Sequence, residues 1–554
     1  MWSESQMSSA LQQLRPLIAD ENFSALDTAI HHLGLDFVLS NTFIEYCRRN
    51  RQSAMVIFLA TLSAHNVPNV EAADASQHDR RGPQKDITLT LCDGVQISVP
   101  NSLKLITPYV LIEQQDWFED EIRFVRHLLQ PGQKVIDVGA NYGVYTLSMA
   151  QRVGPTGSVY SFEPTSSTAA MLEASISVNH FAQITLDRSA LSNRCGTAQF
   201  SLNEQSELNT LTRDEHSMTA SETVSLFTLD DRLRRYKWTD ISFMKIDAEG
   251  EESNILKGGT QFFSELSPLI QYEIKAGTEL HLELVREFAA LGYASYRLVP
   301  GLSLLVPFNA ELPVDAYLLN LFCCKQDRAE ILEKEGLLLM PKSQVLTTGF
   351  VEKNDAVNPS EENNRYTWHQ SMAHLPYGVK FANLWNELAA GDSAEVLKVL
   401  SIYARSQDAT LGLRERFDSL EMSFNLLHPI CGSQNHPLRL ASLARIAKEL
   451  GARAIAVNAL NQLNNHILEH KHITPSEPFL IPGKRFELIS FGENFDKWLH
   501  ASVLEEIELL ESYSSFYTGA APRNRLESIR KLGFSSPEMN RRLSLVESRF
   551  PHRI

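Results

Sequence analysis

Between residues 134 and 325, short apolar runs alternate with segments whose apolar positions recur every three to four residues. The apolar runs are KVIDVG, SVYSFE, ITLDRSAL, FMKIDAE, LIQYEIK, YASYRLV and YLLNLFCC. Strands that alternate with helices in this way predict an α/β fold with a doubly wound sheet. In such sheets, ligands bind beyond the carboxyl ends of the strands.

The pattern changes on both sides of this segment. Apolar positions at helical spacing over residues 7–64 predict a helical lead-in, and the polar stretch 71–85 is typical of a linker. Alternating apolar and polar residues around an Asp-Gly pair predict a hairpin over 87–100, and residues 109–129 are predicted to form one helix.

After residue 326 the apolar stripes have the helical period and strand patterns disappear, apart from a polar connection at 347–366. We therefore expect three parts. These are a helical N-terminal region with a linker at 1–85, an α/β domain at 86–326 and an all-α C-terminal domain at 327–554.

Composition narrows the function classes. The formal charge is −16, with 43 acidic and 28 basic residues in 1–350 (net −15) and 24 and 23 in the rest (net −1). Such a charge argues against a general binder of nucleic acids or anionic membranes. The six cysteines have no regular spacing, and neither a signal peptide nor an apolar run of roughly 18–20 residues is evident, so a cytoplasmic location is expected.

The first predicted strand ends in a glycine turn. A dinucleotide fingerprint starting at Gly139 needs glycine at positions 141 and 144, where the chain has Asn141 and Val144. The observed pattern is D-x-G-x-N-x-G, from Asp137 to Gly143. This pattern resembles the first motif of class I S-adenosylmethionine-dependent methyltransferases.

A second motif narrows the resemblance. The segment FMKIDAEGEESNILKGG, residues 243–259, contains K-I-D-x-E-G-x-E after the fourth predicted strand. Together with VIDVGANYGVYTL it resembles the FkbM family of methyltransferases, over roughly residues 109–325. The resemblance includes Glu163-Pro164, the SALS turn at 189–192 and the YEIK segment. It implies a class I methyltransferase Rossmann-like sheet and S-adenosylmethionine as the cofactor.

The resemblance also implies the cofactor-binding residues. The glycine turn would surround the methionine portion, the Glu163 carboxylate would accept from both ribose hydroxyls, and the SALS turn would lie near adenine. The full set is Asp137, Gly139, Asn141, Tyr142, Gly143, Glu163, Ser189 and Ala190. The alternative is that Asp137 only caps a turn and Glu163 is an exposed strand end.

Methyl transfer requires alignment of the acceptor oxygen with the methyl group and a group that receives the proton. Asp247 is the first candidate for the group that receives the proton, because it ends a strand with an apolar sequence. Glu249, Glu251 and Glu273 are further candidates, and Lys245 could hold a carboxylate in place. Alternatively, Glu249 and Glu251 cap the helix that follows.

The same carboxylates offer oxygen ligands for Mg²⁺, but the family does not generally imply a metal, and none is expected. His466, His470 and His472 have a spacing that brings two of them to one helix face. Without matching cysteines, a solvated helix end is favoured over a zinc site.

The resembled family typically O-methylates hydroxyls, often on sugars. We therefore expect an O-methyltransferase acting on a sugar hydroxyl of a glycan or glycoconjugate. The alternatives are a small natural product or lipid as the acceptor, or a cofactor-binding scaffold that acts through its helical domain. That domain lies outside the shared motifs and could hold the acceptor, bind a protein partner or mediate self-association.

Overall fold

The computed structural model describes residues 86–201, 210–211, 221–276, 279–341, 367–387, 394–432 and 436–551. These residues belong to one compact unit that spans 83–554. The predicted helical lead-in, the linker that follows it and the polar connection at 347–366 lie outside the described residues.

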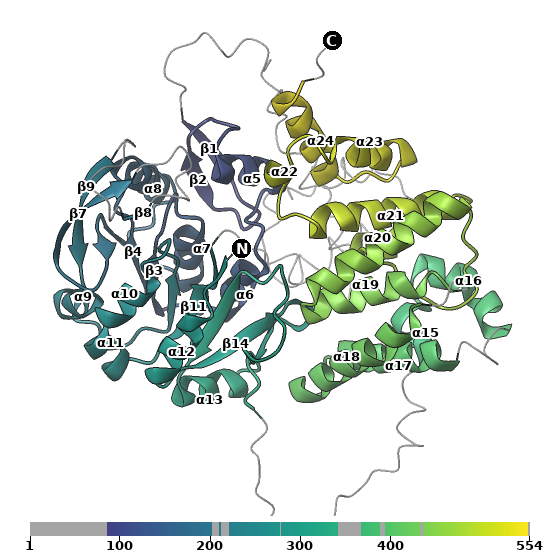
Figure 1. Ribbon diagram of the computed structural model, residues 1–554, viewed down its shortest axis with the longest axis horizontal. Helices are drawn as coiled ribbons and strands as arrows, with labels where there is room; N and C mark the ends of the chain where they lie inside the picture. Colours follow the sequence, from purple (N-terminus) through teal and green to yellow (C-terminus); the bar gives the residue numbers. More distant parts are fainter. Residues whose placement is uncertain are drawn as a thin grey trace, which may run out of the picture. The chain divides into compact units, whose positions relative to one another are not determined.

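The central sheet has eight strands in the order β15-β14-β16-β11-β10-β3-β4-β5. Figure 1 labels β3, β4, β11 and β14 of this sheet. The five strands from β11 to β5 in this order run parallel, whereas β16, β14 and β15 pair antiparallel. Six of the seven predicted strands are confirmed as single strands of this sheet, and β15 is an addition. The seventh, ITLDRSAL, forms β5 and then, after a break, β6 of a second sheet. The bounds are β3 Lys134–Val138, β4 Ser158–Phe162, β5 Ile184–Asp187, β10 Phe243–Ile246, β11 Leu269–Glu273, β14 Ala294–Val299, β15 Leu304–Pro307 and β16 Asn320–Cys324.

Helices cover both faces of this sheet. Successive strand residues point to opposite faces, so Phe243 packs in the core beside α6 and α7, while Met244 packs in the core beside α9, α11 and α12. This two-sided burial explains why the strands are continuous apolar runs. The bounds are α6 Asp120–Leu128, α7 Val144–Val153, α8 Ser166–Val178, α9 Leu229–Tyr236, α10 Glu252–Lys257, α11 Thr260–Glu265, α12 Glu283–Ala290 and α13 Gln326–Lys334.

The strand order reverses between β3 and β10, which are adjacent in the sheet although about a hundred residues separate them in the chain. The carboxyl ends of β4, β3, β10 and β11 therefore lie side by side at one edge. A ligand crevice is expected at such a switch point.

The hairpin predicted over 87–100 is confirmed as β1 (Ile87–Thr90) and β2 (Gln96–Val99). The single helix predicted over 109–129 is wrong, because the chain forms two helices there, α5 (Ile106–Gln114) and α6. Gln115 adopts a left-handed conformation with φ 60° and ends α5. Five residues, 115–119, therefore separate the two helices.

A second, four-stranded sheet was not predicted. Its order is β6-β9-β7-β8, and it follows β5 in the chain. Its strands are short or mostly exposed, so their apolar alternation is weak. The bounds are β6 Ala190–Leu191, β7 Gly196–Ser201, β8 Thr210–Leu211 and β9 Ser221–Phe227, with a separate pair β12 Lys275–Ala276 and β13 Glu279–Leu280.

The helical C-terminal region is confirmed. Its helices share a core with Leu304 and Val306 of β15, so the α/β part and the helical part are joined by apolar packing. None of the helices that the described residues form is long and apolar enough to cross a bilayer. The bounds are α15 Trp368–Met372, α16 Pro376–Glu387, α17 Ala394–Gln407, α18 Leu413–Leu427, α19 Arg439–Leu450, α20 Arg453–His470, α21 Phe495–Leu510, α22 Ser515–Thr518, α23 Arg523–Leu532 and α24 Pro537–Arg549.

Candidate active site

A cavity of about 470 Å³ lies at the carboxyl ends of the parallel strands. This volume is within the range of small-molecule sites, about 300–1,000 Å³. All the site residues predicted from the sequence line the cavity except Gly143, which is the N-cap of α7. The predicted lining residues are Asp137, Gly139, Asn141, Tyr142, Glu163, Ser189, Ala190, Lys245, Asp247, Glu249 and Glu273.

Asp137 is buried inside β3, with 1% of its surface exposed. Its Oδ2 accepts a hydrogen bond from Thr146 Oγ1 at 2.5 Å, which ties the strand to α7. Its Oδ1 is buried and has no hydrogen-bond partner among the described residues. Burial raises the pKa of this carboxyl group. A buried acceptor oxygen without a partner at the edge of a cavity indicates that Asp137 binds a donor group of a ligand. It argues against the alternative that Asp137 only caps a turn.

The glycine turn lets the backbone pass close to the neighbouring strand end. Gly139 has φ +78°, and a Cβ placed there would lie 1.7 Å from the backbone oxygen of Asp247. Gly143 has φ +95°, and its Cβ would lie 2.3 Å from Leu172 of α8. Asn141 between them also has positive φ, +48°. Glycine is therefore required at both positions for the loop to keep this shape.

Glu163 follows β4 and braces the same loop. Its Oε2 accepts from the backbone N–H of Asn141 at 2.9 Å, and its Oε1 accepts from that of Thr165 at 2.8 Å. Only 6% of the residue is exposed, so it is not an exposed strand end. Burial raises the pKa of Glu163 to about 7. The Thr165 side chain also bonds to this carboxylate. Because a carboxylate has about four acceptor positions, Glu163 can still accept from a ribose hydroxyl.

The SALS turn lines the cavity beside Glu163. The Ser189 hydroxyl donates to Asp187 Oδ1 at 2.7 Å. Asp187 also pairs with Arg232 at 2.8 Å and accepts from the Tyr236 hydroxyl at 2.7 Å. This network fixes the turn, and it presents Ser189 and Ala190 to the cavity.

Lys245 and Asp247 form the ion pair predicted from the sequence. Lys245 Nζ donates to Asp247 Oδ2 at 2.6 Å. The lysine lies opposite Asp137 in the β10–β3 register, and its ammonium group lies 4.7 Å from the centre of the Tyr145 ring. Burial alone would lower the pKa of Lys245, but the surrounding carboxylates, Asp247 first, raise it above the usual range. The buried ammonium group therefore stays charged.

Glu249 and Glu273 complete a group of three carboxylates with Asp247. One ligand oxygen from each lies within 4.8 Å of the others. Burial, and then the charge of Asp247, raises the pKa of Glu273 to about 10, so this group is protonated at neutral pH. Glu249 has φ +50°, a conformation that is costly for a residue other than glycine. The spacing suits a divalent cation, but exposed acidic groups often adopt it without one.

The helix-capping alternative named Glu249 and Glu251. Glu251 occupies the N-cap position of α10, but its side chain makes no capping hydrogen bond. Glu252 Oε1 accepts from the backbone N–H groups of Ala248 and Gly250, at 2.9 and 3.3 Å. Glu251 Oε2 accepts from the Ser192 hydroxyl at 2.9 Å, which ties this loop to the SALS turn. Glu252 therefore caps the loop before α10, and Glu251 braces it.

The sequence did not identify several residues that line the cavity. The Tyr145 hydroxyl donates to Glu119 Oε2 at 2.6 Å and accepts from Gln271 at 3.0 Å. Burial raises the pKa of Glu119. No motif marks this glutamate, because it lies in the break that the helix prediction overlooked. The other missed lining residues include Thr107, Trp117, Phe118, Leu319, Tyr513 and Tyr517.

The histidines of α20 do not form a metal group. His466 and His470 stack on one helix face at a centroid distance of 4.1 Å, as their spacing predicts. His472 instead pairs with Asp496 at 2.8 Å. Among the described residues, the one group that could hold a metal is the carboxylate trio above. The five described cysteines are free thiols.

The sheet order, with an antiparallel strand beside β11, and the acid-lined cavity at its switch point define the class I methyltransferase fold. Residues 137–295 match the family model described as "Methyltransferase FkbM domain". The chain therefore contains an FkbM domain and is an S-adenosylmethionine-dependent methyltransferase. No curated protein matches the chain.

Several solved structures resemble part of the chain. An rRNA methylase from Streptococcus thermophilus has 11% identity and a TM-score of 0.23, and the match covers 37% of this chain and 93% of that one. An S-adenosylmethionine-dependent methyltransferase from Aquifex aeolicus has 13% identity and a TM-score of 0.23, and the match covers 39% of this chain and 93% of that one. An S-adenosylmethionine-dependent O-methyltransferase from Thermotoga maritima has 14% identity and a TM-score of 0.22, with 44% of this chain and 78% of that one covered. Likeness at this level does not bear on the acceptor.

Proposed function

We propose that this protein transfers the methyl group of S-adenosylmethionine to a hydroxyl oxygen, and that the acceptor is a sugar in a glycan or glycoconjugate. One observation carries the proposal. Asp247, held by Lys245 at the end of β10, opens into the same cavity as Asp137 and Glu163. A fixed carboxylate is thus available beside the residues proposed to bind the cofactor.

The residues present fit the cofactor. Asp137 offers a buried acceptor without a partner among the described residues, and the glycine turn brings backbone close to the cavity. In the proposed arrangement Asp137, Gly139, Asn141 and Tyr142 hold the methionine portion. Glu163 binds the ribose, and the SALS turn borders the adenine. Bound there, S-adenosylmethionine supplies an electrophilic methyl group.

Asp247 receives the proton in the proposed reaction. As the acceptor oxygen forms its bond to the methyl carbon, the methyl–sulfur bond breaks and the hydroxyl proton passes to the carboxylate. Lys245 keeps that carboxylate in one orientation through the 2.6 Å contact. Glu273 is protonated at neutral pH, and it therefore acts as a hydrogen-bond donor to the acceptor and not as the base.

The scaffold alternative is less well supported. A protein that kept the fold without the reaction would not need an open cleft beside the cofactor residues. The cavity extends past those residues to aromatic side chains of the helical region, and Tyr517 at its rim is 52% exposed. The C-terminal helices therefore border the cleft without sealing it.

The acceptor class can be tested with the purified chain. It is incubated with S-adenosylmethionine and, in separate reactions, neutral oligosaccharides, a lipid extract, tRNA and rRNA. Release of S-adenosylhomocysteine and the mass of the product are measured. A mass gain of one methylene group on an oligosaccharide supports the proposal. Methylation confined to RNA or to lipids would refute the sugar acceptor but leave the methyltransferase activity intact.

A further inference from the structure

Four aromatic side chains form one wall of the cavity. Trp117 and Phe118 come from the break between α5 and α6, and Tyr513 and Tyr517 come from the segment after α21. The Phe118 ring lies 4.6 Å from that of Trp117, 5.1 Å from that of Tyr513 and 6.5 Å from that of Tyr517. This aromatic wall therefore joins two parts of the chain that are about 400 residues apart.

The helical segment of the wall is held firmly against α5. Glu113 of α5 is fully buried and accepts hydrogen bonds from the Ser515 hydroxyl and, at 3.0 Å, from the Ser515 backbone N–H. Gln114 donates to the backbone oxygen of Tyr513 at 2.6 Å. These bonds fix the residues on either side of Ser514, and with them the backbone of the segment that carries both tyrosines.

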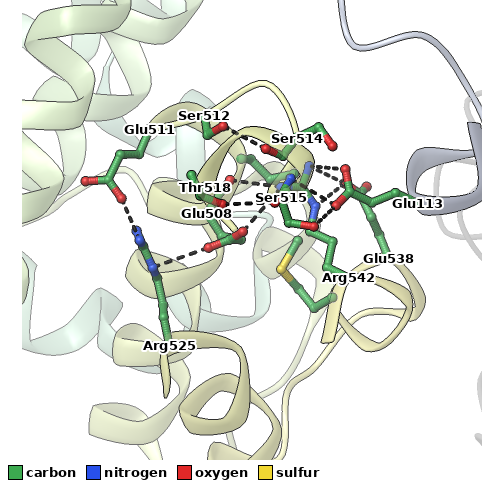
Figure 2. Close-up of polar contacts among 12 residues, drawn as sticks. Glu113, Glu508, Glu511, Ser512, Ser514, Ser515, Thr518, Arg525, Glu538 and Arg542 are labelled. Atoms are coloured by element: carbon green, nitrogen blue, oxygen red, sulfur yellow. Dashed lines mark hydrogen bonds and ion pairs between the residues drawn. The ribbon is translucent and has the colours of Figure 1, made fainter. Parts of the chain in front are cut away.

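A buried arginine supports this anchor. Arg542 of α24 is 1% exposed and pairs with Glu538 at 3.0 Å, Glu508 at 3.4 Å and Glu113 at 3.9 Å (Figure 2). Figure 2 shows Arg542 and Ser515 meeting at Glu113. A network this deeply buried is retained only if its partners stay together. The tyrosines are therefore a built part of the cavity.

The aromatic wall adjoins the carboxylate side of the cavity. Glu119 directly follows Phe118 in the chain, and it accepts the hydrogen bond of Tyr145, whose ring lies under the Lys245 ammonium group. The segment of the aromatic wall is therefore linked through Glu119 and Tyr145 to the Lys245–Asp247 pair. In the proposed reaction the acceptor lies beside this pair, because Asp247 receives its proton.

The charge of the cavity limits what can bind there. Its described lining has seven carboxyl groups and one ammonium group, that of Lys245. The carboxyl groups belong to Glu119, Asp137, Glu163, Asp247, Glu249, Glu251 and Glu273. With Glu273 protonated, the other six carboxyl groups still outnumber the single ammonium group. An anionic acceptor would therefore be repelled, whereas the hydroxyls of a neutral sugar can donate to the carboxylate oxygens.

We infer that the C-terminal helical region supplies part of the acceptor site. Tyr517, with Phe118 behind it, is the surface on which an uncharged sugar ring stacks while its hydroxyls face the carboxylates. Tyr517 combines an exposed ring with a fixed backbone, which suits a recognition residue. This inference rests on the proposed sugar acceptor. It adds that the sugar is uncharged and that Tyr517 is the residue that recognises its ring.

The test uses methyl β-D-glucopyranoside and methyl β-D-galactopyranoside as neutral probes, with methyl β-D-glucuronide as the charged match of the glucoside. Saturation-transfer NMR measures their binding to the full chain in the presence of S-adenosylhomocysteine. We expect the neutral glycosides to bind at least roughly tenfold more tightly than the glucuronide. Equal binding of the glucuronide, or binding of none of the three probes, would overturn the inference.

Three variants isolate the tyrosine. Tyr517→Leu removes the ring and should weaken glycoside binding by roughly tenfold, whereas Tyr517→Phe keeps the ring and should bind like wild type. Val379→Ala, at a 63% exposed residue of α16 that does not line the cavity, is the surface control. S-adenosylhomocysteine affinity, measured by calorimetry, should be the same in all of them. Normal glycoside binding by Tyr517→Leu would refute the aromatic wall.

The outcome separates this inference from the proposed function. If wild type methylates an acceptor other than a sugar, the proposed function fails. The KM of Tyr517→Leu for that acceptor then tests, independently of the sugar assignment, whether the aromatic wall contacts the acceptor. An unchanged KM would show that the helical region takes no part in acceptor binding.

Discussion

The loop after β3 provides a quantitative test of how the fold builds the cofactor site. Gly139 has φ +78°, and a Cβ there would lie 1.7 Å from the backbone oxygen of Asp247. No side-chain rotation relieves this overlap, because the clashing atom belongs to the backbone. Gly139→Ala must therefore push apart two strand ends that are hydrogen-bonded to each other, since the Asp247 N–H donates to the Val138 oxygen at 3.1 Å.

Two costs add up in this variant. A Cβ in the left-handed region costs about 1–2 kcal/mol, and an overpacked contact that displaces backbone costs about 1–3 kcal/mol more. Gly533→Ala is the matched control, because Gly533 has φ +88° and open space where the Cβ would lie. That control carries the backbone cost alone. The difference of about 1–3 kcal/mol between the variants is the cost of the clash.

Urea unfolding measures both free energies, and calorimetric titration with S-adenosylmethionine measures binding. We expect Gly139→Ala to lose about 2–5 kcal/mol of stability and most of its cofactor affinity. Gly533→Ala should lose only about 1–2 kcal/mol and bind normally. If the two variants were equally stable and bound the cofactor alike, the close approach of the two strand ends would not shape the site.

Four further predictions follow from the same contacts. Asp247→Asn should bind S-adenosylmethionine normally but lower turnover by about 10²–10⁴-fold, and turnover at the wild-type rate would remove Asp247 as the base. The folded-state pKa of Glu273, about 10, is above its ordinary 4.5, so wild type loses stability as pH rises between these values. Glu273→Gln should therefore gain stability over wild type between pH 5 and pH 8 in thermal unfolding, by at most about 1.4 kcal/mol per pH unit, and a pH-independent difference would contradict the raised pKa. Arg542→Met leaves Glu113 buried without its cation and should lower the free energy of unfolding in urea by about 3–5 kcal/mol. The exposed control Arg123→Met should lower it by under about 1 kcal/mol. Similar losses in the two variants would argue against the buried network. Treatment with EDTA should leave turnover unchanged, because the buried lysine ammonium already supplies positive charge among the carboxylates, and activity lost on chelation but restored by Mg²⁺ would assign the trio to a metal.

The sheet, and the meeting of Asp137 and Asp247 at its edge, could be predicted because they depend on local sequence. A strand buried on both faces must be apolar along its length, as Phe243 and Met244 show, and this signal is contained in a few residues. Asp137 and Asp247 come at or directly after such strands. Once the strands are parallel and adjacent, their carboxyl ends must meet.

The aromatic wall could not be predicted in this way. Residues 109–129 have helical spacing throughout, and the break depends on Gln115 leaving the helix and on Asp116 pairing with Arg126 at 2.8 Å. Tyr513 and Tyr517 are held at the site by contacts between distant parts of the chain, such as those of Ser515 with Glu113 and of Tyr513 with Gln114, across about 400 residues. No local pattern contains a contact of that sequence separation.

The crowding of acidic groups explains why the site needs both parts of the chain. Burial and mutual repulsion hold Glu273 in its protonated form. The carboxylate cluster therefore destabilises the fold when no positive charge compensates it. Lys245 offsets part of this repulsion from within β10. A cationic sulfonium ligand would offset more of it, while an acceptor that adds negative charge would make it worse. The cavity is therefore selective by charge at the strand ends and by ring contact at the aromatic wall, and this wall is complete only with Tyr513 and Tyr517 of the helical region.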